Sequence, residues 1–108
     1  MRVSKETRRM NVRKALRNQL KENGADNPLW LDLVEDYMKF WDLKEELQKS
    51  IRTKGAMVVV KNGSQEFYKK NDAVVELPKV SKRMTDILEI LKIHAVVVEN
   101  EDEGDDDV

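Results

Sequence analysis

Residues 28–51 read PLWLDLVEDYMKFWDLKEELQKSI, and this stretch decides the fold. Apolar side chains recur in it every three or four residues, which is the period of an α-helix. Asn27 and Pro28 favour a helix start and Gly55 a stop, so we expect a helix from about Pro28 to Thr53. The apolar residues of its first half cover an arc of roughly 200°, which is wider than one neighbouring helix can bury. We therefore expect one contact surface inside the protomer and a second between protomers.

The surface between protomers is expected on the first half of this helix. Aromatic side chains there could suggest stacking on nucleic-acid bases, but helical spacing favours a core or a protomer interface. The residues assigned to the oligomer interface are Trp30, Val34, Tyr37, Met38 and Trp41.

After Gly55 the helical period of the apolar residues ends and a strand-like pattern begins. Met57–Val60 is rich in β-branched residues, Asn62-Gly63 is a tight-turn dipeptide, and Glu66–Tyr68 can return as a second strand. We expect a short β-hairpin here. Because an isolated two-stranded hairpin is marginally stable in water, it should pack on the helices or pair with a neighbour.

A third helix is expected from about Asn71 or Asp72 to Lys92. Pro78 lies inside it, and proline removes one backbone hydrogen bond and clashes with the preceding turn. We therefore expect a kink near Val74–Leu77, or a helix that begins near Leu77. Near 3–4–3–4 spacing predicts a helix-packing seam. The seam residues are Ala73, Leu77, Val80, Met84, Ile87, Leu88 and Leu91.

The net charge of −1 hides a strong asymmetry. Residues 1–24, expected to form a helix from Ser4 to Asn23, carry eight Lys or Arg against two Glu, whereas residues 99–107 carry seven carboxylates and no cation. Phosphate contacts from Lys and Arg dominate non-specific DNA affinity, so the basic helix is the candidate DNA-binding element; a solvated helix face is the alternative. The assigned cations are Arg8, Arg9, Arg13, Lys14, Arg17 and Lys21.

Two further charged segments keep more than one interpretation. Lys61, Lys69 and Lys70 flank the hairpin and form a second DNA-contacting edge or protect a strand edge from foreign strands. Residues 94–99 are expected to form a short strand, and the acidic tail beyond them has no core-forming residues and should be disordered alone. That tail docks on a basic partner surface, competes with DNA for the basic helix, or only aids solubility.

Most catalytic and metal-binding classes lack their residues here. Without cysteine there is no disulfide, thiolate zinc site or cysteine nucleophile. His94 is the only histidine, and the run Asp102–Asp107 lacks the ligand alternation of a calcium loop. There is no glycine-rich phosphate loop, no signal peptide and no apolar run of about 18 residues. We expect no enzyme activity, no metal, no cofactor and no membrane partner.

Together these elements predict a mainly α fold. A helical hairpin carries a small β-hairpin between its two long helices, with a basic N-terminal helix and a ring-type oligomer. The expected division is a basic, DNA-binding segment at 1–24, an oligomerisation core at 28–93 and an acidic C-terminal tail at 94–108.

Three motif groups follow one another between Leu31 and Leu91. The first, in LDLVEDYMKFWDLKEELQKSI, is Asp36-Tyr37 with Trp41-Asp42-Leu43. The second and third, in KNGSQEFYKKNDAVVELPKVSKRMTDILEIL, are the Lys61-Asn62-Gly63 turn followed by Tyr68–Asp72, and the closing helix with Glu76-Leu77, Lys79-Val80, Met84, Ile87 and Leu88. In this order the stretch resembles the phage terminase small subunit family. Pro78 departs from the resemblance, since an ordinary helix former is expected there.

The resemblance implies a non-catalytic viral protein that works in the host cell cytoplasm. Such subunits bind the packaging-initiation region of double-stranded viral DNA, assemble into rings and hand the DNA to the large subunit, which carries the ATPase and nuclease. It further implies that the helical hairpin mediates ring formation, that the N-terminal part meets DNA, and that the C-terminal segment contacts the large subunit. The acidic tail lies outside the resemblance.

Two other functions stay open at this point. A small helical DNA-binding transcription regulator would share the basic helix, but it would form a dimer on a palindromic site. A partner-binding adaptor that never touches DNA would show no salt-sensitive DNA affinity.

Overall fold

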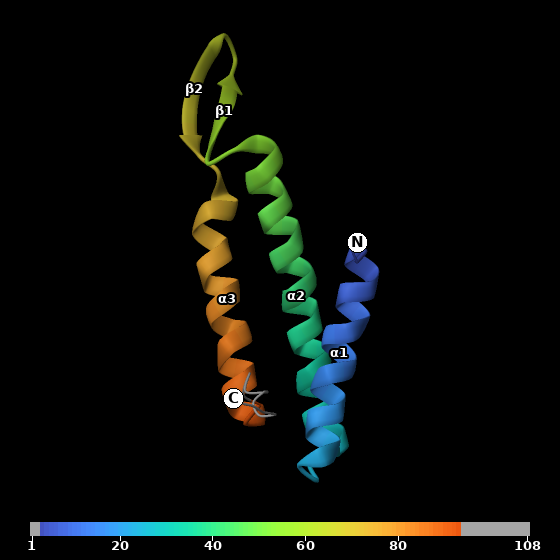
Figure 1. Ribbon diagram of the computed structural model, residues 1–108. Helices are drawn as coiled ribbons and strands as arrows, with labels where there is room; N and C mark the ends of the chain where they lie inside the picture. The colour runs from blue at the N-terminus through green and yellow to red at the C-terminus, as the bar shows by residue number, and fades with distance from the viewer. Residues whose placement is uncertain (1–2, 94–108) are drawn as a thin grey trace, which may run out of the picture.

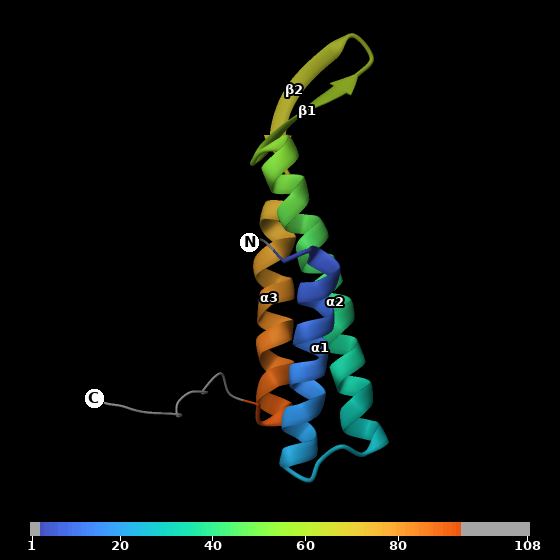
Figure 2. The same ribbon diagram turned by 45° about the vertical axis from the view of Figure 1, so that its right-hand side comes forward.

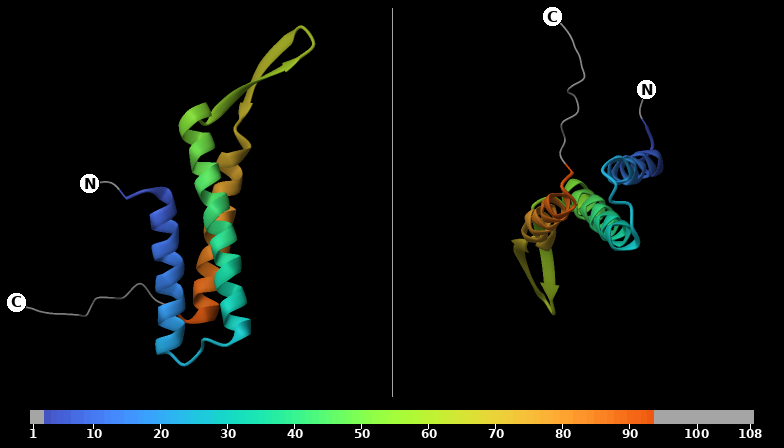
Figure 3. Two further views of the ribbon diagram at one scale, coloured as in Figure 1. Left: turned by 90° about the vertical axis from the view of Figure 1, so that its right-hand side faces the viewer. Right: turned by 90° about the horizontal axis from the view of Figure 1, so that it is seen from below.

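The computed structural model describes residues 3–93 as three helices and one two-stranded sheet. α2 and α3 run antiparallel, and the sheet projects beyond their common end (Figure 1). Seen from below, α2 lies between α1 and α3 (Figure 3). The expected mainly helical class with a β-hairpin between two long helices is confirmed. In chain order the elements are α1 (Lys5–Glu22), α2 (Pro28–Lys54), β1 (Met57–Asn62), β2 (Gln65–Lys70) and α3 (Asp72–Leu91).

The helix ends follow the capping residues of the sequence. The Ser4 hydroxyl accepts the Thr7 amide N–H at 3.1 Å, which caps α1. The Asn27 side-chain oxygen accepts the Leu29 N–H at 3.0 Å, one residue before Pro28 opens α2. Gly55 ends α2 with φ at 85°. Glycine adopts this positive φ with little strain because it has no Cβ. The predicted bounds of α1 and α2 are therefore confirmed to within a residue.

One apolar core joins all three helices. α2 contributes three buried side chains to the centre of this core. α3 packs against them with four residues of its predicted seam. α1 closes the core on the remaining side, so the middle of the wide α2 arc is covered within the protomer, whereas Leu29 at its start is 78% exposed. The buried residues are Leu16, Leu20, Val34, Met38, Trp41, Val80, Met84, Ile87, Leu91 and Ile93.

α3 begins at Asp72 and continues through Pro78 to Leu91. The alternative in which this helix begins near Leu77 is therefore wrong. Its start is fixed by Asn71, whose side-chain oxygen accepts the Ala73 N–H at 3.0 Å. Pro78 is exposed, so water can satisfy the carbonyl that loses its helical partner. The cap and the apolar seam outweigh the proline.

Asn71 also fastens the end of α2 to the start of α3. It is only 7% exposed, and its side-chain nitrogen donates to the Gly55 carbonyl at 2.9 Å and the Ser50 hydroxyl at 3.2 Å. Its backbone N–H donates to the Ala56 carbonyl at 2.7 Å. A buried amide with all these partners holds the base of the β-hairpin in place.

The β-hairpin is longer than expected and stands apart from the helices (Figure 2). Its register pairs Met57 with Lys70 and Asn62 with Gln65, so the turn residues are Gly63 and Ser64. Gly63 has φ 66°, which suits the first central position of a type II′ turn. All six β2 residues are exposed, so the expected packing of the hairpin on the helices does not occur. Pairing with a neighbour stays a prediction.

The predicted short strand at 94–99 and the acidic tail lie outside the described residues. Within residues 3–93, none of the helices has the length and apolar character needed to cross a membrane.

Truncating the central core methionine should destabilise the fold. Met38 is fully buried, so Met38→Ala leaves a cavity and should lower the free energy of unfolding by about 2–4 kcal/mol. Urea unfolding followed by circular dichroism measures this loss. The matched control is Met10→Ala on α1, where the side chain is 60% exposed and the change should stay within about 0.5 kcal/mol. Equal losses in the two variants would contradict the core assignment.

Candidate nucleic-acid interface

The helix expected to meet DNA has two faces of different character. Leu16 and Leu20 are buried against the other helices, and Val12 packs beside them. At about 100° per residue, Arg9 and Arg13 fall on this inner side and Arg8 falls at its margin. Lys14, Arg17 and Lys21 fall on the opposite, outer side. The structure thus divides the six predicted DNA-binding cations into two sets.

The inner cations pair with carboxylates of α2. Arg9 makes two hydrogen bonds to Asp42, from Nε at 2.7 Å and from the guanidinium NH₂ at 2.9 Å. This two-point geometry is the strongest arrangement for an arginine and a carboxylate. The other pairs lie on either side of it, because α1 and α2 are antiparallel. They are Arg13–Glu35 at 2.7 Å, Arg8–Glu45 at 2.9 Å and Lys5–Glu46 at 3.9 Å. We call these four contacts the α1–α2 ion-pair ladder.

The ladder also places Arg8 over an aromatic ring. Its guanidinium carbon lies 5.4 Å from the centre of the Trp41 ring, within the range of a cation–π interaction. Trp41 is itself 8% exposed, so Arg8 covers the edge of the core while it pairs with Glu45. Arg8 therefore joins the ionic and apolar contacts between the two helices.

The hydrogen bonds from Arg9 lower the pKa of Asp42 below its ordinary value, and the pKa of Arg9 is raised in turn by the hydrogen bond to Asp42. Both side chains are more than a third exposed, so solvent screens the pair and its stabilisation is modest. Elsewhere on α2, burial raises the pKa of Tyr37.

A double-mutant cycle should detect the Arg9–Asp42 contact. Arg9→Ala, Asp42→Ala and the double variant should give a coupling of about 0.5–1 kcal/mol in urea unfolding, falling in high salt. The control cycle uses Lys82 and Asp86, an exposed pair at 3.3 Å within α3, for which about 0.3–0.5 kcal/mol is expected. A coupling of zero at Arg9–Asp42 in low salt would contradict the ladder.

The contribution of Asp42 should depend on pH. Because its pKa is lowered in the folded state, the stabilisation is fully present above the unfolded pKa of about 3.9 and is lost as pH falls through the folded pKa. The stability difference between wild type and Asp42→Asn should therefore be largest near neutral pH and shrink below about pH 4. Urea unfolding across this range measures it. In an Arg9→Gln background the pH dependence should largely disappear, and its persistence there would assign it to other groups.

The outer cations of α1 remain accessible. Lys14, Arg17 and Lys21 are exposed, and none of them forms an ion pair with another residue between 3 and 93. Their spacing of three and four residues sets them along one stripe of the helix. We call these three residues the outer basic row. A row of cations on one exposed helix face can contact successive phosphates without displacing any protein carboxylate.

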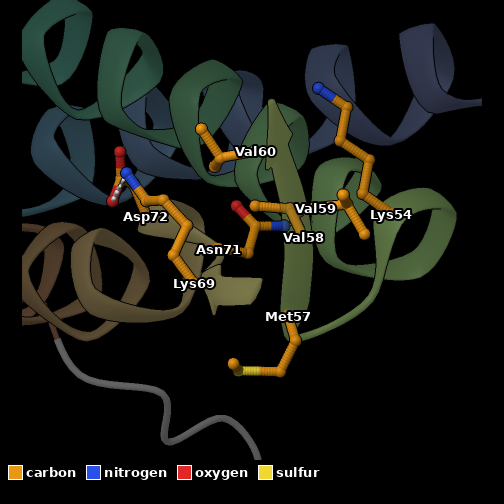
Figure 4. Close-up of a pocket in the computed structure, with 8 residues that line it drawn as sticks. All are labelled: Lys54, Met57, Val58, Val59, Val60, Lys69, Asn71 and Asp72. Atoms are coloured by element: carbon orange, nitrogen blue, oxygen red, sulfur yellow. Dashed lines mark ion pairs between the residues drawn. The ribbon is translucent and has the colours of Figure 1, made fainter. Parts of the chain in front are cut away.

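The lysines of the β-hairpin are partly committed to neighbours. Lys61 lies 3.7 Å from Glu66 across the strands, and Lys69 lies 3.7 Å from Asp72. An open hollow of about 590 Å³ lies at the base of the hairpin, where Lys54, Lys69 and apolar β1 side chains surround it (Figure 4). Within residues 3–93 no group of three His, Asp or Glu is arranged to hold a metal ion.

The five predicted oligomer-interface residues also fall into two sets, three that are buried and two that are partly exposed. Val34 and Met38 are fully buried and Trp41 nearly so, because α1 covers the part of α2 that α3 leaves free. These three side chains belong to the core of the protomer. Trp30 and Tyr37 are half-buried and keep some surface for a second copy. Oligomer formation itself stays a prediction.

Sequence reasoning missed the carboxylates that hold α1. Glu35, Asp42 and Glu45 lie seven and three residues apart on α2, a spacing that sets them on one helix face. This pattern was visible in the sequence, but the antiparallel α1 that it faces was not.

Comparison of the chain with protein-family models, curated proteins and solved structures finds no match.

Proposed function

We propose that this chain is the non-catalytic small subunit of a phage terminase. In this role it binds double-stranded viral DNA in the host cell cytoplasm and presents it to the large subunit, which carries the ATPase and nuclease. The observation that carries the proposal is the outer basic row, three exposed cations on the face of α1 that points away from the core. The resemblance over Leu31 to Leu91 supports it, because that stretch folds as α2, the β-hairpin and α3.

The ion-pair ladder changes which cations the proposal relies on. Arg8, Arg9 and Arg13 must leave a carboxylate before they bind a phosphate, whereas Lys14, Arg17 and Lys21 need not. Each displaced pair costs part of the energy gained from DNA. The outer basic row is therefore the proposed contact surface, and the ladder fixes the helix that carries it.

A single protomer offers few phosphate contacts. Three cations alone give weak, salt-sensitive binding without sequence preference. Copies held together in one assembly would act on the same DNA at high effective concentration, so that weak contacts add up. The proposed homo-oligomer, expected to be a ring, supplies that multiplicity.

Neutralising the outer basic row should weaken DNA binding. In the triple variant Lys14→Ala, Arg17→Ala and Lys21→Ala, fluorescence anisotropy with a labelled duplex should show lower affinity. The slope of log affinity against log salt should become less steep by roughly one for each phosphate that the variant no longer neutralises.

A triple variant of α3 provides the matched control. Lys79, Lys82 and Arg83 are three exposed cations on one face of α3, and two of them pair within that helix, with Glu76 at 3.6 Å and Asp86 at 3.3 Å. Removing them changes net charge equally but should leave most of the affinity. Equal losses in both triple variants would mean that only net charge matters, and an unchanged slope in the α1 variant would exclude the outer basic row. A dimer bound to a palindrome would favour the transcription regulator instead.

A further inference from the structure

The β-hairpin exposes apolar side chains on both of its faces. Side chains alternate along a strand, so the cross-strand pairs Val59–Tyr68 and Val60–Phe67 lie on opposite faces. Val59 is 50% exposed, Phe67 48% and Tyr68 74%. Since a lone two-stranded sheet is marginal in water, these side chains favour a further element packed on the hairpin.

The edges of the hairpin and its charge restrict what that element can be. β1 and β2 pair only with each other among the described residues, so each has one edge open to a further strand. The hairpin and its base carry four lysines but only two carboxylates, those of Glu66 and Asp72. The lysines are Lys54, Lys61, Lys69 and Lys70. A fitting partner is thus an extended segment that is apolar on both faces and continues into acidic residues.

The chain itself contains a segment of this chemistry. Residues 95–98 are Ala-Val-Val-Val, an uninterrupted apolar run that would place side chains on both faces of a strand. Seven carboxylates follow within residues 99–107. We propose that residues 95–98 of a second copy add to the β-hairpin as a third strand, with the acidic residues that follow set against the hairpin lysines.

The segment must come from another copy because its own hairpin is out of reach. α3 runs away from the hairpin to the opposite end of the molecule (Figure 1), and Ile93, two residues beyond Leu91, is packed in the core. The 20 residues of α3 span about 30 Å, whereas the five residues from Ile93 to Val98 extend about 18 Å at most. Within one chain, residues 95–98 therefore cannot reach β1 or β2.

Charge favours this partner over a second hairpin. Two hairpins placed edge to edge would bring their lysines together, and like charges at a sheet edge oppose pairing. The acidic segment brings the opposite charge to the same lysines. The contact joins the two ends of the molecule, so it repeats head to tail and either closes into a ring or grows as a filament. It needs no DNA and is independent of the proposed DNA contact.

A single proline tests the added strand in the full-length chain. Val97→Pro removes a backbone donor from the middle of the segment, while Val97→Thr keeps a β-branched residue there. Native mass spectrometry and light scattering should show wild type and Val97→Thr well above the 12.6 kDa of one chain. Val97→Pro should weaken association at least tenfold. A wild-type monomer, or an oligomer unchanged by Val97→Pro, would overturn the proposal.

Cross-linking identifies the surface that the segment contacts. The chain has no cysteine, so a Tyr68→Cys chain can be mixed with an isotope-labelled Val97→Cys chain and treated with a short bis-maleimide. Mixed cross-linked dimers should form in high yield. A Lys14→Cys chain is the control on α1 and should give few. Preferential linkage of Val97→Cys to Lys14→Cys would overturn the proposal, because the tail would then lie on the basic helix.

Discussion

The apolar surface of α2 is wider than one helix can cover, and the arrangement of the chain follows from this constraint. α3 returns antiparallel and covers one side through Val80, Met84 and Ile87. α1 covers the other side with only Leu16 and Leu20 buried, a small area for an 18-residue helix. The ion-pair ladder supplements that area. Apolar burial thus positions α3, whereas α1 is held by a mixture of burial and paired charge.

Much of this fold could be predicted from local signals. Ser4, Asn27 and Gly55 determine helix ends through contacts within a few residues, and the period of the apolar residues gives the α3 seam. The Asn62-Gly63 dipeptide predicted the hairpin, although the turn residues proved to be Gly63 and Ser64. Such features depend on short stretches of chain, which a sequence displays directly.

Features that depend on contacts between distant parts of the chain were predicted less well. The width of the α2 arc predicts a surface for another protomer, because nothing local indicates that α1 folds back over Val34 and Met38. For the same reason the sequence of α1 alone does not separate cations that pair with carboxylates from cations that stay exposed. The carboxylates of α2 decide which cations are paired. The start of α3 ahead of Pro78, by contrast, follows from the local Asn71 cap, whose side-chain oxygen accepts the N–H of Ala73 two residues along the chain.

The ladder gives α1 a direction as well as a position. Its inner cations are neutralised against α2, so the electrostatic field of the helix points outward from one side, along Lys14, Arg17 and Lys21. A helix with unpaired cations all around would attract an anion equally from every angle. In a closed assembly of identical copies, each protomer would present its charged side at the same angle to the symmetry axis. The pairing inside one protomer would then set the path along which a long polyanion meets the whole assembly.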